Sequence, residues 1–389
     1  MKIKSFFIYG TGKYADVFFP KIENLIQDSL LKLIGFVDKE PKRVGKNYGI
    51  YKIFAPDILS ETNFDFIFIF TNDKNFSEIY KELIEKKHIP SEKIGGYVDL
   101  LVMAEKYSRS SQQCLQNRAP LIYDCFPFFN EIDILHIRME MLNPFVDRFV
   151  VVEMDRDHHG REKSYNFEAY KNDFIKFEDK IIYVKSKAIP LYTKEKEDWT
   201  LENYQRNEIM IGLKEAQCED VICISDCDEI INPLIMKEIK ENIYSPHRSV
   251  ILKILSDFPV VMNQYFMYYY FNCCHRVKWR GSIITKFKNL TEPQVLRDIR
   301  EMLPAIDNGG WHFSYFGDCE QIDIKTQSIV ESKTLSKHDI MNCLKNGKDI
   351  YGRKGEEFEL DFLKKDQIPI PEIDKWIEKY PKYFWNNEN

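Results

Sequence analysis

The residues with the clearest capacity for chemistry are Asp226, Asp228 and Glu229, three carboxylates within four positions. They follow the apolar run VICIS at residues 221–225, which predicts a buried strand. Ligands of open α/β sheets collect outside the carboxyl ends of strands, and oxygen ligands two residues apart suit Mg²⁺ or Mn²⁺. Asp226 and Asp228 are therefore predicted to hold a divalent cation that neutralises a diphosphate. The alternative is an acidic turn without a ligand.

A second candidate is the segment GGWHFSYFG at residues 309–317, which gathers two glycines, an indole, an imidazole and a hydroxyl. This composition is more typical of a ligand-contacting loop than of a core strand. His312 is a candidate third metal ligand through its neutral imidazole, and Trp311 is placed to stack on a sugar or a base. In the alternative, Trp311 belongs to the core and His312 bonds a backbone carbonyl.

A third candidate lies near the N-terminus, where Gly10-x-Gly12-x-x-Ala15 follows a strand pattern and opens a helical one. The glycines permit a tight turn and the close approach of a phosphate, and the helix N-terminus attracts the anion. Asp38 ends the next strand and is placed to accept a hydrogen bond from a ribose hydroxyl. The pattern predicts a nucleotide site, although the same turn also closes Rossmann-like folds that hold no ligand.

The elements that must position these residues alternate between strand and helix. Strand-like runs in the first 105 residues are separated by helical patterns, which predicts a parallel sheet covered by helices. The same alternation returns after a polar stretch. We therefore predict an α/β protein with a Rossmann-like domain over residues 1–105, a linker over 106–119, a second α/β domain over 120–345 and a helical tail over 346–389.

Composition limits the partners. Lys plus Arg number 55 and Asp plus Glu 61, a net charge of −6, so nucleic acid is not an expected partner. The sequence shows no secretory signal and no apolar run of about 20 residues. Its nine cysteines, an odd number, resemble neither a disulfide framework nor a zinc site. We expect a soluble cytoplasmic protein with at most peripheral membrane association.

From residue 121 to about residue 353 the chain resembles glycosyltransferase family 17. The resemblance is carried by ordered motifs, namely NEIDILHIRMEML, VDRFVVVE, DHHGREKSYNF, SDCDEI and GGWHFSYFG. It implies a GT-A-type nucleotide-sugar-binding fold and inverting transfer of a sugar, with N-acetylglucosamine favoured, from a UDP-sugar to an acceptor. By this resemblance Asp226 and Asp228 hold Mn²⁺ or Mg²⁺ against the UDP diphosphate.

The acceptor that we expect is a bacterial surface glycan, free or lipid-linked, because the chain has an added first domain in place of a membrane anchor. That domain resembles the Rossmann-like domains that accompany bacterial sugar-modifying enzymes, as the motifs IYGTGKYAD and IGFVDKE indicate. The resemblance implies a fold class and names no ligand. A nucleotide bound there stays a prediction from the glycine pattern.

Further residues are candidates for donor binding, and they are Glu131, Arg138, Glu153, Arg206 and Lys325. Glu131 and Glu153 end early strands, where related folds contact the uridine or ribose; the alternative is capping of a nearby helix. Arg206 is placed to reach a phosphate and Lys325 to neutralise the leaving diphosphate, with a solvated surface position as the alternative for each. For Arg138 the alternative is a structural ion pair with Asp133 or Asp147.

Inverting transfer also needs a base for the acceptor hydroxyl, and the candidates are Glu229, Asp257 and Asp307. The aromatic run YFMYYYF at residues 265–271 offers rings for an acceptor sugar, with core packing as the alternative. Two other functions stay open. One is a nicotinamide-dependent or nucleotide-sugar-modifying enzyme that works through the first domain, and the other is a non-catalytic nucleotide-sugar-binding module.

Overall fold

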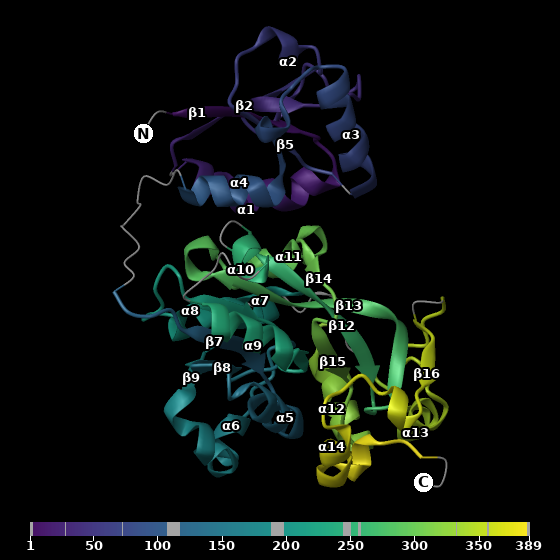
Figure 1. Ribbon diagram of the computed structural model, residues 1–389. Helices are drawn as coiled ribbons and strands as arrows, with labels where there is room; N and C mark the ends of the chain where they lie inside the picture. The colour runs from purple at the N-terminus through teal and green to yellow at the C-terminus, as the bar shows by residue number, and fades with distance from the viewer. Residues whose placement is uncertain are drawn as a thin grey trace. The chain divides into compact units, whose positions relative to one another are not determined.

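Apolar runs that alternate with helical segments build two separate sheets, which Figure 1 shows in a computed structural model of the chain. The structure describes residues 3–27, 29–71, 73–106, 117–187, 198–243, 250–255, 258–331, 333–355 and 358–386. Two units divide the chain, Met1–Leu115 and Gln116–Asn389. Each unit combines a sheet containing parallel strands with helices, so the predicted α/β class is confirmed. Most of the predicted linker, residues 107–116, lies outside the described residues.

The first unit is built on a six-stranded sheet in the order β3-β4-β2-β1-β5-β6. All neighbouring strands pair in parallel except β3, which is antiparallel to β4. Central parallel strands are buried on both faces, which explains the nearly continuous apolar sequences of β1 and β5. In chain order the elements are β1 (Lys4–Tyr9), α1 (Lys13–Gln27), β2 (Leu31–Val37), β3 (Asn47–Tyr48), β4 (Tyr51–Phe54), α2 (Ile58–Glu61), β5 (Phe66–Ile69), α3 (Asp73–Glu85), η1 (Ser91–Lys93), β6 (Ile94–Gly96) and α4 (Tyr97–Lys106).

The glycine turn of this unit is held by its own neighbours. Gly10 has φ = +109°, and a Cβ there would lie 2.7 Å from the carbonyl oxygen of Phe70, so only glycine fits. The backbone N–H of Thr11 donates to Oδ2 of Asp38 at 3.0 Å, and the Thr11 hydroxyl donates to the same oxygen. Ala15 is buried. Asp38 thus has a structural role in the turn, and a nucleotide at Gly10 and Gly12 stays a prediction.

The second unit contains the larger sheet, whose main path runs β11-β15-β12-β13-β10-β7-β8-β9. Strands β9, β8, β7 and β10 are mutually parallel, and β13 joins them antiparallel to β10. Its helices and strands are β7 (Ile122–Phe128), α5 (Ile132–Leu142), β8 (Arg148–Met154), α6 (Asn166–Ala169), η2 (Lys171–Lys180), β9 (Ile181–Ser186), α7 (Thr200–Asn207), α8 (Ile209–Gly212), β10 (Val221–Ile224), β11 (Glu229–Ile231), α9 (Pro233–Asn242), α10 (Val250–Leu255), β12 (Val260–Tyr268), β13 (Cys273–Lys286), η4 (Phe287–Asn289), α11 (Pro293–Asp298), η5 (Arg300–Met302), β14 (Ala305–Ile306), β15 (Gly310–Ser314), α12 (Cys319–Ser328), α13 (Lys337–Asn346), β16 (Leu360–Phe362), η7 (Lys365–Gln367), α14 (Ile373–Lys379) and η8 (Pro381–Tyr383).

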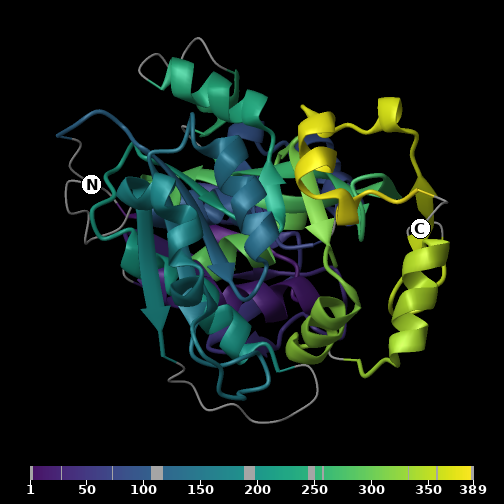
Figure 2. The ribbon, with the colours of Figure 1, turned by 90° about the horizontal axis from the view of Figure 1, so that it is seen from below.

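The C-terminal segment packs on this unit as a mixture of helix and strand. Helices α12, α13 and α14 lie at the end of the unit away from β7–β9, in Figures 1 and 2 alike. The segment from residue 346 was predicted to be helical, yet it also contains β16, which pairs antiparallel with β13. Trp376 of α14 is buried in the main core. The tail is therefore part of the second unit.

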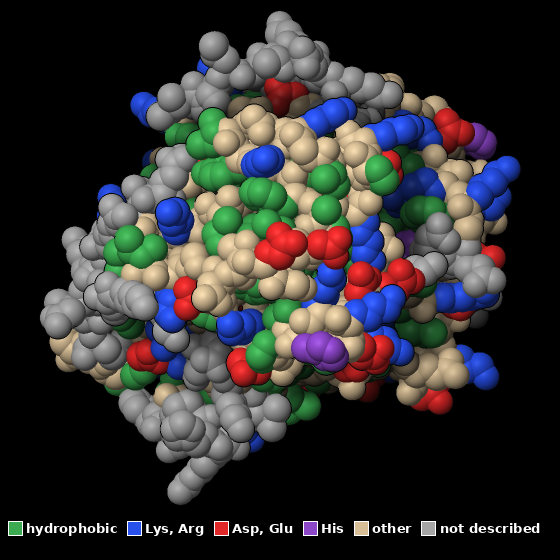
Figure 3. Space-filling model, turned by 90° about the horizontal axis from the view of Figure 1, so that it is seen from above, with side chains coloured by type: hydrophobic (Ala, Val, Ile, Leu, Met, Phe, Trp, Pro, Cys, Tyr) green, Lys and Arg blue, Asp and Glu red, His purple; other side chains and the backbone are tan. Residues whose placement is uncertain are grey.

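Three features concern the surface and the cysteines of the protein. No helix among the described residues is long and apolar enough to cross a membrane. On the face that Figure 3 shows, Lys and Arg side chains are interspersed with Asp and Glu. Seven described cysteines are free. Cys218 is disulfide-bonded, although the cysteine pattern predicts no disulfide framework.

Candidate functional site

A cavity of about 890 Å³ opens where β7 and β10 end. Its volume lies in the range of about 300–1,000 Å³ that is typical of small-molecule sites. The cavity gathers six of the residues predicted for metal or donor binding, and these are Glu131, Arg206, Asp226, Asp228, His312 and Lys325. The strand-end position predicted for the site is therefore the position of a large cavity.

Asp226 is held by two arginines. Nη2 of Arg206 donates to its Oδ1 at 2.8 Å, and Nη2 of Arg297 donates to its Oδ2 at 2.7 Å. Both arginines are buried, while the Asp226 side chain is 32% exposed toward the cavity. Burial alone would raise the pKa of Asp226, but the charges of Arg297 and Arg206 outweigh it and hold the pKa well below its usual range. Its carboxylate therefore stays ionised, with each oxygen bonded to a guanidinium group.

Asp228 faces a different set of partners. Nζ of Lys325 donates to its Oδ2 at 2.7 Å, and Nε2 of His312 lies 3.5 Å from its Oδ1. The same Lys325 nitrogen lies 3.6 Å from Oε1 of Glu131. Burial would raise the pKa of Asp228, but Lys325 and His312 outweigh it and lower that pKa strongly. Asp228 is thus a charged, nearly enclosed carboxylate between a lysine and an imidazole.

Strand pairing brings His312 to the acidic turn. β11 pairs antiparallel with β15, so that Glu229 lies opposite His312, and the N–H of Phe313 donates to the carbonyl oxygen of Asp228 at 2.7 Å. β12 pairs with the other side of β15, and the ring of Phe266 stacks on the imidazole at 4.8 Å between centroids. The segment predicted as a loop is therefore a buried strand. Gly310 is required there because a Cβ would lie 2.0 Å from the carbonyl oxygen of Ile230.

Arg138 supports the acidic turn from inside the core. Its side chain is fully buried and forms a two-pronged ion pair with Asp124, which is also fully buried. Its Nη1 donates to the carbonyl oxygens of Asp226, Cys227 and Glu229 at 2.9–3.1 Å. Arg138 does not line the cavity, so its predicted place in donor binding is not supported. Arg138 does form the structural ion pair that is its alternative role. Its acidic partner is Asp124, however, and not Asp133 or Asp147.

Glu229 is buried and has its own hydrogen-bond donors. Arg297 donates to both of its carboxylate oxygens, at 2.6 and 2.9 Å, and the indole N–H of Trp279 donates to Oε1 at 2.6 Å. The side chain has no exposed surface and is not among the residues that line the cavity. A base must reach the acceptor hydroxyl, so the position of Glu229 does not suit the predicted role.

The predicted trio of metal ligands is not assembled. Among the residues that the structure describes, no three His, Cys, Asp or Glu side chains form a group able to hold a metal ion. Asp226 is engaged by arginines, whereas Asp228 and His312 do face each other. Mg²⁺ in nucleotide-using enzymes takes one or two carboxylates and completes its shell with water and substrate phosphates. Asp228 and His312 fit a site of that kind, with Lys325 as the competing partner of the carboxylate.

Three other predicted residues lie elsewhere. Glu153 is buried and accepts hydrogen bonds from the backbone N–H groups that begin α6 and from Lys163, which matches its helix-capping alternative. Trp311 is 2% exposed in the core, where its indole N–H donates to the carbonyl oxygen of Pro369. Asp307 accepts from Asn263 and does not line the cavity. Asp257 lies outside the described residues.

Several cavity residues were not predicted from the sequence. Arg297 and Arg300 come from α11 and η5, and the Arg300 guanidinium lies 4.9 Å from the ring of Trp279. Trp199, at the start of α7, lines the cavity and is 40% exposed. Glu331 follows α12 and also lines the cavity. No local motif marks these residues, because each reaches the site through long-range packing.

Comparison with known proteins adds two family matches. The model of a family described as glycosyltransferase family 17 matches residues 58–389. A second model, described as C2185-like, N-terminal, matches residues 2–95. A search of curated proteins returned no match to the chain. The first match covers the acidic turn, β15, Lys325 and the whole of the second unit.

Proposed function

Because this chain belongs to glycosyltransferase family 17, we propose that its second unit transfers a sugar from a UDP-sugar to a glycan or lipid-linked glycan, with inversion at the anomeric carbon. N-acetylglucosamine is the proposed sugar. The observation that carries this proposal is the 890 Å³ cavity at the strand ends, with Asp228, His312 and Lys325 facing one another beside it. The order β9-β8-β7-β10 with antiparallel β13 supports a GT-A-type fold.

Cations on the cavity wall support a donor that bears phosphate. Arg300 and Lys278 both line the cavity. Burial and the neighbouring charge of Arg297 lower the pKa of Arg300, and burial lowers the pKa of Lys278 to about 8. A cation whose charged form is disfavoured gains most from an added anion. We therefore place the diphosphate of the donor against Arg300 and Lys278.

The cation site completes the donor side. Asp228 and His312 would hold Mn²⁺ or Mg²⁺, which would supply positive charge to the departing diphosphate when bound. Lys325 adds charge at the same place, because Asp228 and Glu131 outweigh the effect of burial and raise its pKa. Asp226 would have a structural role, because its two carboxylate oxygens hold the guanidinium groups of Arg206 and Arg297 beside the acidic turn.

For the base we propose Glu331. Among the residues that the structure describes, no hydrogen bond or ion pair is formed by its carboxylate, and the residue lines the cavity. Burial raises the pKa of Tyr351, and the charge of Glu331 adds to that effect, so the carboxylate lies near Tyr351. Glu331 would take the proton of the acceptor hydroxyl as its oxygen bonds to the anomeric carbon and the bond to UDP breaks.

Replacing Glu331 with Gln is expected to lower kcat for transfer by about 10²–10⁴-fold, the usual contribution of a positioned base. UDP affinity is expected to stay the same, because Glu331 pairs with no described cation of the donor side. The measurement is UDP release with and without acceptor, together with UDP titration. Glu320→Gln, on the exposed start of α12, is the matched control. Full kcat in Glu331→Gln would exclude this residue as the base.

The experiment that tests the function is calorimetric titration of UDP and UDP-N-acetylglucosamine, with and without Mn²⁺. We expect both to bind, at least about tenfold more tightly with Mn²⁺, because a cation held by Asp228 and His312 would add positive charge beside the diphosphate. ADP serves as the matched nucleotide and NAD as the probe of the first unit. Equal binding of ADP and UDP, or no binding of either, would contradict the proposed donor class, and NAD binding alone would favour the first unit as the working part.

A further inference from the structure

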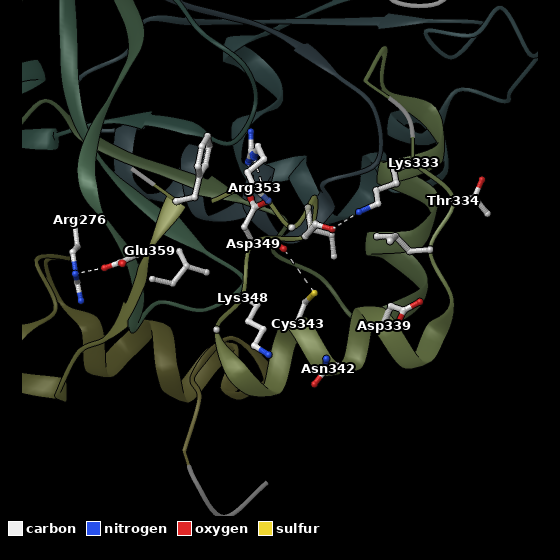
Figure 4. A pocket seen from close by; sticks show the side chains of 16 residues that line it. Arg276, Lys333, Thr334, Asp339, Asn342, Cys343, Lys348, Asp349, Arg353 and Glu359 are labelled. Atoms are coloured by element: carbon white, nitrogen blue, oxygen red, sulfur yellow. Dashed lines mark hydrogen bonds and ion pairs between the residues drawn. The ribbon is translucent and has the colours of Figure 1, made fainter. Parts of the chain in front are cut away.

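A second cavity, of about 840 Å³, lies in the C-terminal part of the second unit (Figure 4). Helix α13 lines it with Asp339, Asn342 and Cys343, whose spacing places them on one helix face. Arg276 of β13 and Glu359 beside β16 line another wall and form an ion pair. The cavity is thus bounded by α13, by the segment that follows it and by one end of β13.

Polar groups in this cavity are held in place before any ligand arrives. Asp349 is buried, accepts from the backbone N–H groups of Tyr351 and Arg353 at 3.0 and 2.9 Å, and pairs with the Arg353 guanidinium at 2.6 Å. Nζ of Lys333 donates to the carbonyl oxygen of Tyr351 at 3.1 Å. The Arg353 guanidinium lies 4.4 Å from the ring of Phe358. The lining is therefore a fixed set of donors and acceptors beside one aromatic ring.

This cavity adjoins the donor cavity. Arg353 and Phe358 line both of them. A row of contacts leads from one cavity to the other. Nζ of Lys325 lies 5.5 Å from the centre of the Tyr315 ring, and the Tyr315 hydroxyl lies 2.8 Å from the Tyr351 hydroxyl. The Arg353 guanidinium lies 5.2 Å from the centre of the Tyr351 ring. A molecule that reaches from the second cavity toward Asp228 would pass along these tyrosines and beside Glu331.

We propose that the second cavity binds the acceptor glycan, holding the sugar units behind the one that receives the transferred sugar. This inference rests on the proposed function. Each sugar hydroxyl both donates and accepts hydrogen bonds, which suits a wall of paired acids, bases and amides, and the ring of Phe358 suits the apolar face of a sugar. The cations of the cavity are largely balanced by Asp339, Asp349 and Glu359, so a neutral polar ligand fits better than a free phosphate.

The test fills the cavity with a large side chain. Asn342→Trp places an indole on the lining face of α13, and Met341→Trp, exposed on the same helix and outside the lining, is the matched control. Saturation-transfer NMR is run on both variants and the parent chain with a panel of methyl glycosides and disaccharides of hexoses and N-acetylhexosamines. We expect at least one disaccharide to bind the parent and Met341→Trp, and to bind Asn342→Trp at least about tenfold more weakly.

Titration of UDP into all three proteins separates the two proposals. Equal UDP affinity with loss of saccharide binding in Asn342→Trp alone supports the acceptor site. A disaccharide bound equally by both variants would refute it, as would the absence of any saccharide binding to the parent. Failure of UDP to bind the parent would instead refute the donor assignment, and the effect of Asn342→Trp on saccharide binding would still decide the role of this cavity.

Discussion

Asp228→Asn is expected to lower kcat for transfer by about 10²–10³-fold, the size of effect seen when one preorganised electrostatic group is removed from an active site. The substitution keeps the shape of the side chain and removes the charge that faces Lys325 and His312. UDP release in the presence of acceptor, measured over a range of Mn²⁺ concentrations, gives the result. We also expect the stimulation of UDP binding by Mn²⁺ to disappear.

The control for this variant is Asp323→Asn, which lies on α12 two residues before Lys325 and outside the cavity lining. It should behave like the parent chain in both measurements. More than half of the parent kcat in Asp228→Asn would show that this carboxylate takes no part in transfer. Loss of kcat with the Mn²⁺ effect retained would instead place the cation elsewhere and leave Asp228 as the partner of Lys325.

Arg138→Met is expected to lower the free energy of unfolding of the second unit by about 3–5 kcal/mol, as measured when one partner of a buried ion pair is removed. The change leaves the Asp124 carboxylate charged and fully buried, and it strips three carbonyl oxygens of the acidic turn of their donor. All five tryptophans follow residue 198, so urea unfolding followed by tryptophan fluorescence reports the second unit without signal from the first.

The double variant Arg138→Met with Asp124→Leu tests the reason for this loss. Replacing both partners of a buried pair with apolar side chains is often nearly neutral, so the double variant should recover much of the stability. Its activity should remain low, because the turn carbonyls still lack the guanidinium group. An Arg138→Met protein as stable as the parent would mean that Asp124 finds water or another donor, and that the pair does not support the turn.

Local patterns were enough to predict most strands and to place Asp226 and Asp228 after a strand, where they line the 890 Å³ cavity. Buried parallel strands need continuous apolar sequence. An acidic triplet that follows such a strand lies at the carboxyl end of the sheet. The partners of that triplet were not predictable. Arg297 and Trp279 reach Glu229 from 68 and 50 positions along the chain, and an arginine in the last turn of α11 looks like any solvated helix residue.

The pair Gly309 and Gly310 shows a second limit of local patterns, because it suggests a ligand site where the structure has strand packing. Together with the nearby indole and imidazole, Gly309 and Gly310 predict a ligand-contacting loop, but their small size allows β15 to pack closely against its neighbours. A Cβ at Gly309 would lie 2.6 Å from Cβ of Met262, and one at Gly310 would meet the backbone of β11. Glycine is required wherever two backbones approach closely, and the sequence does not reveal whether the approaching backbone belongs to a turn or to a strand.

The proposed cation site, which consists of Asp228 and His312, has a thermodynamic consequence. Two protein ligands leave most of the coordination shell of a divalent cation to water and to phosphate oxygens, so the cation alone should bind weakly and exchange freely. A bound nucleotide would raise the affinity for the cation by supplying the missing oxygens, and the cation would raise the affinity for the nucleotide by the same factor. Metal and donor would then enter and leave as a single complex, and dialysis without nucleotide would remove the metal.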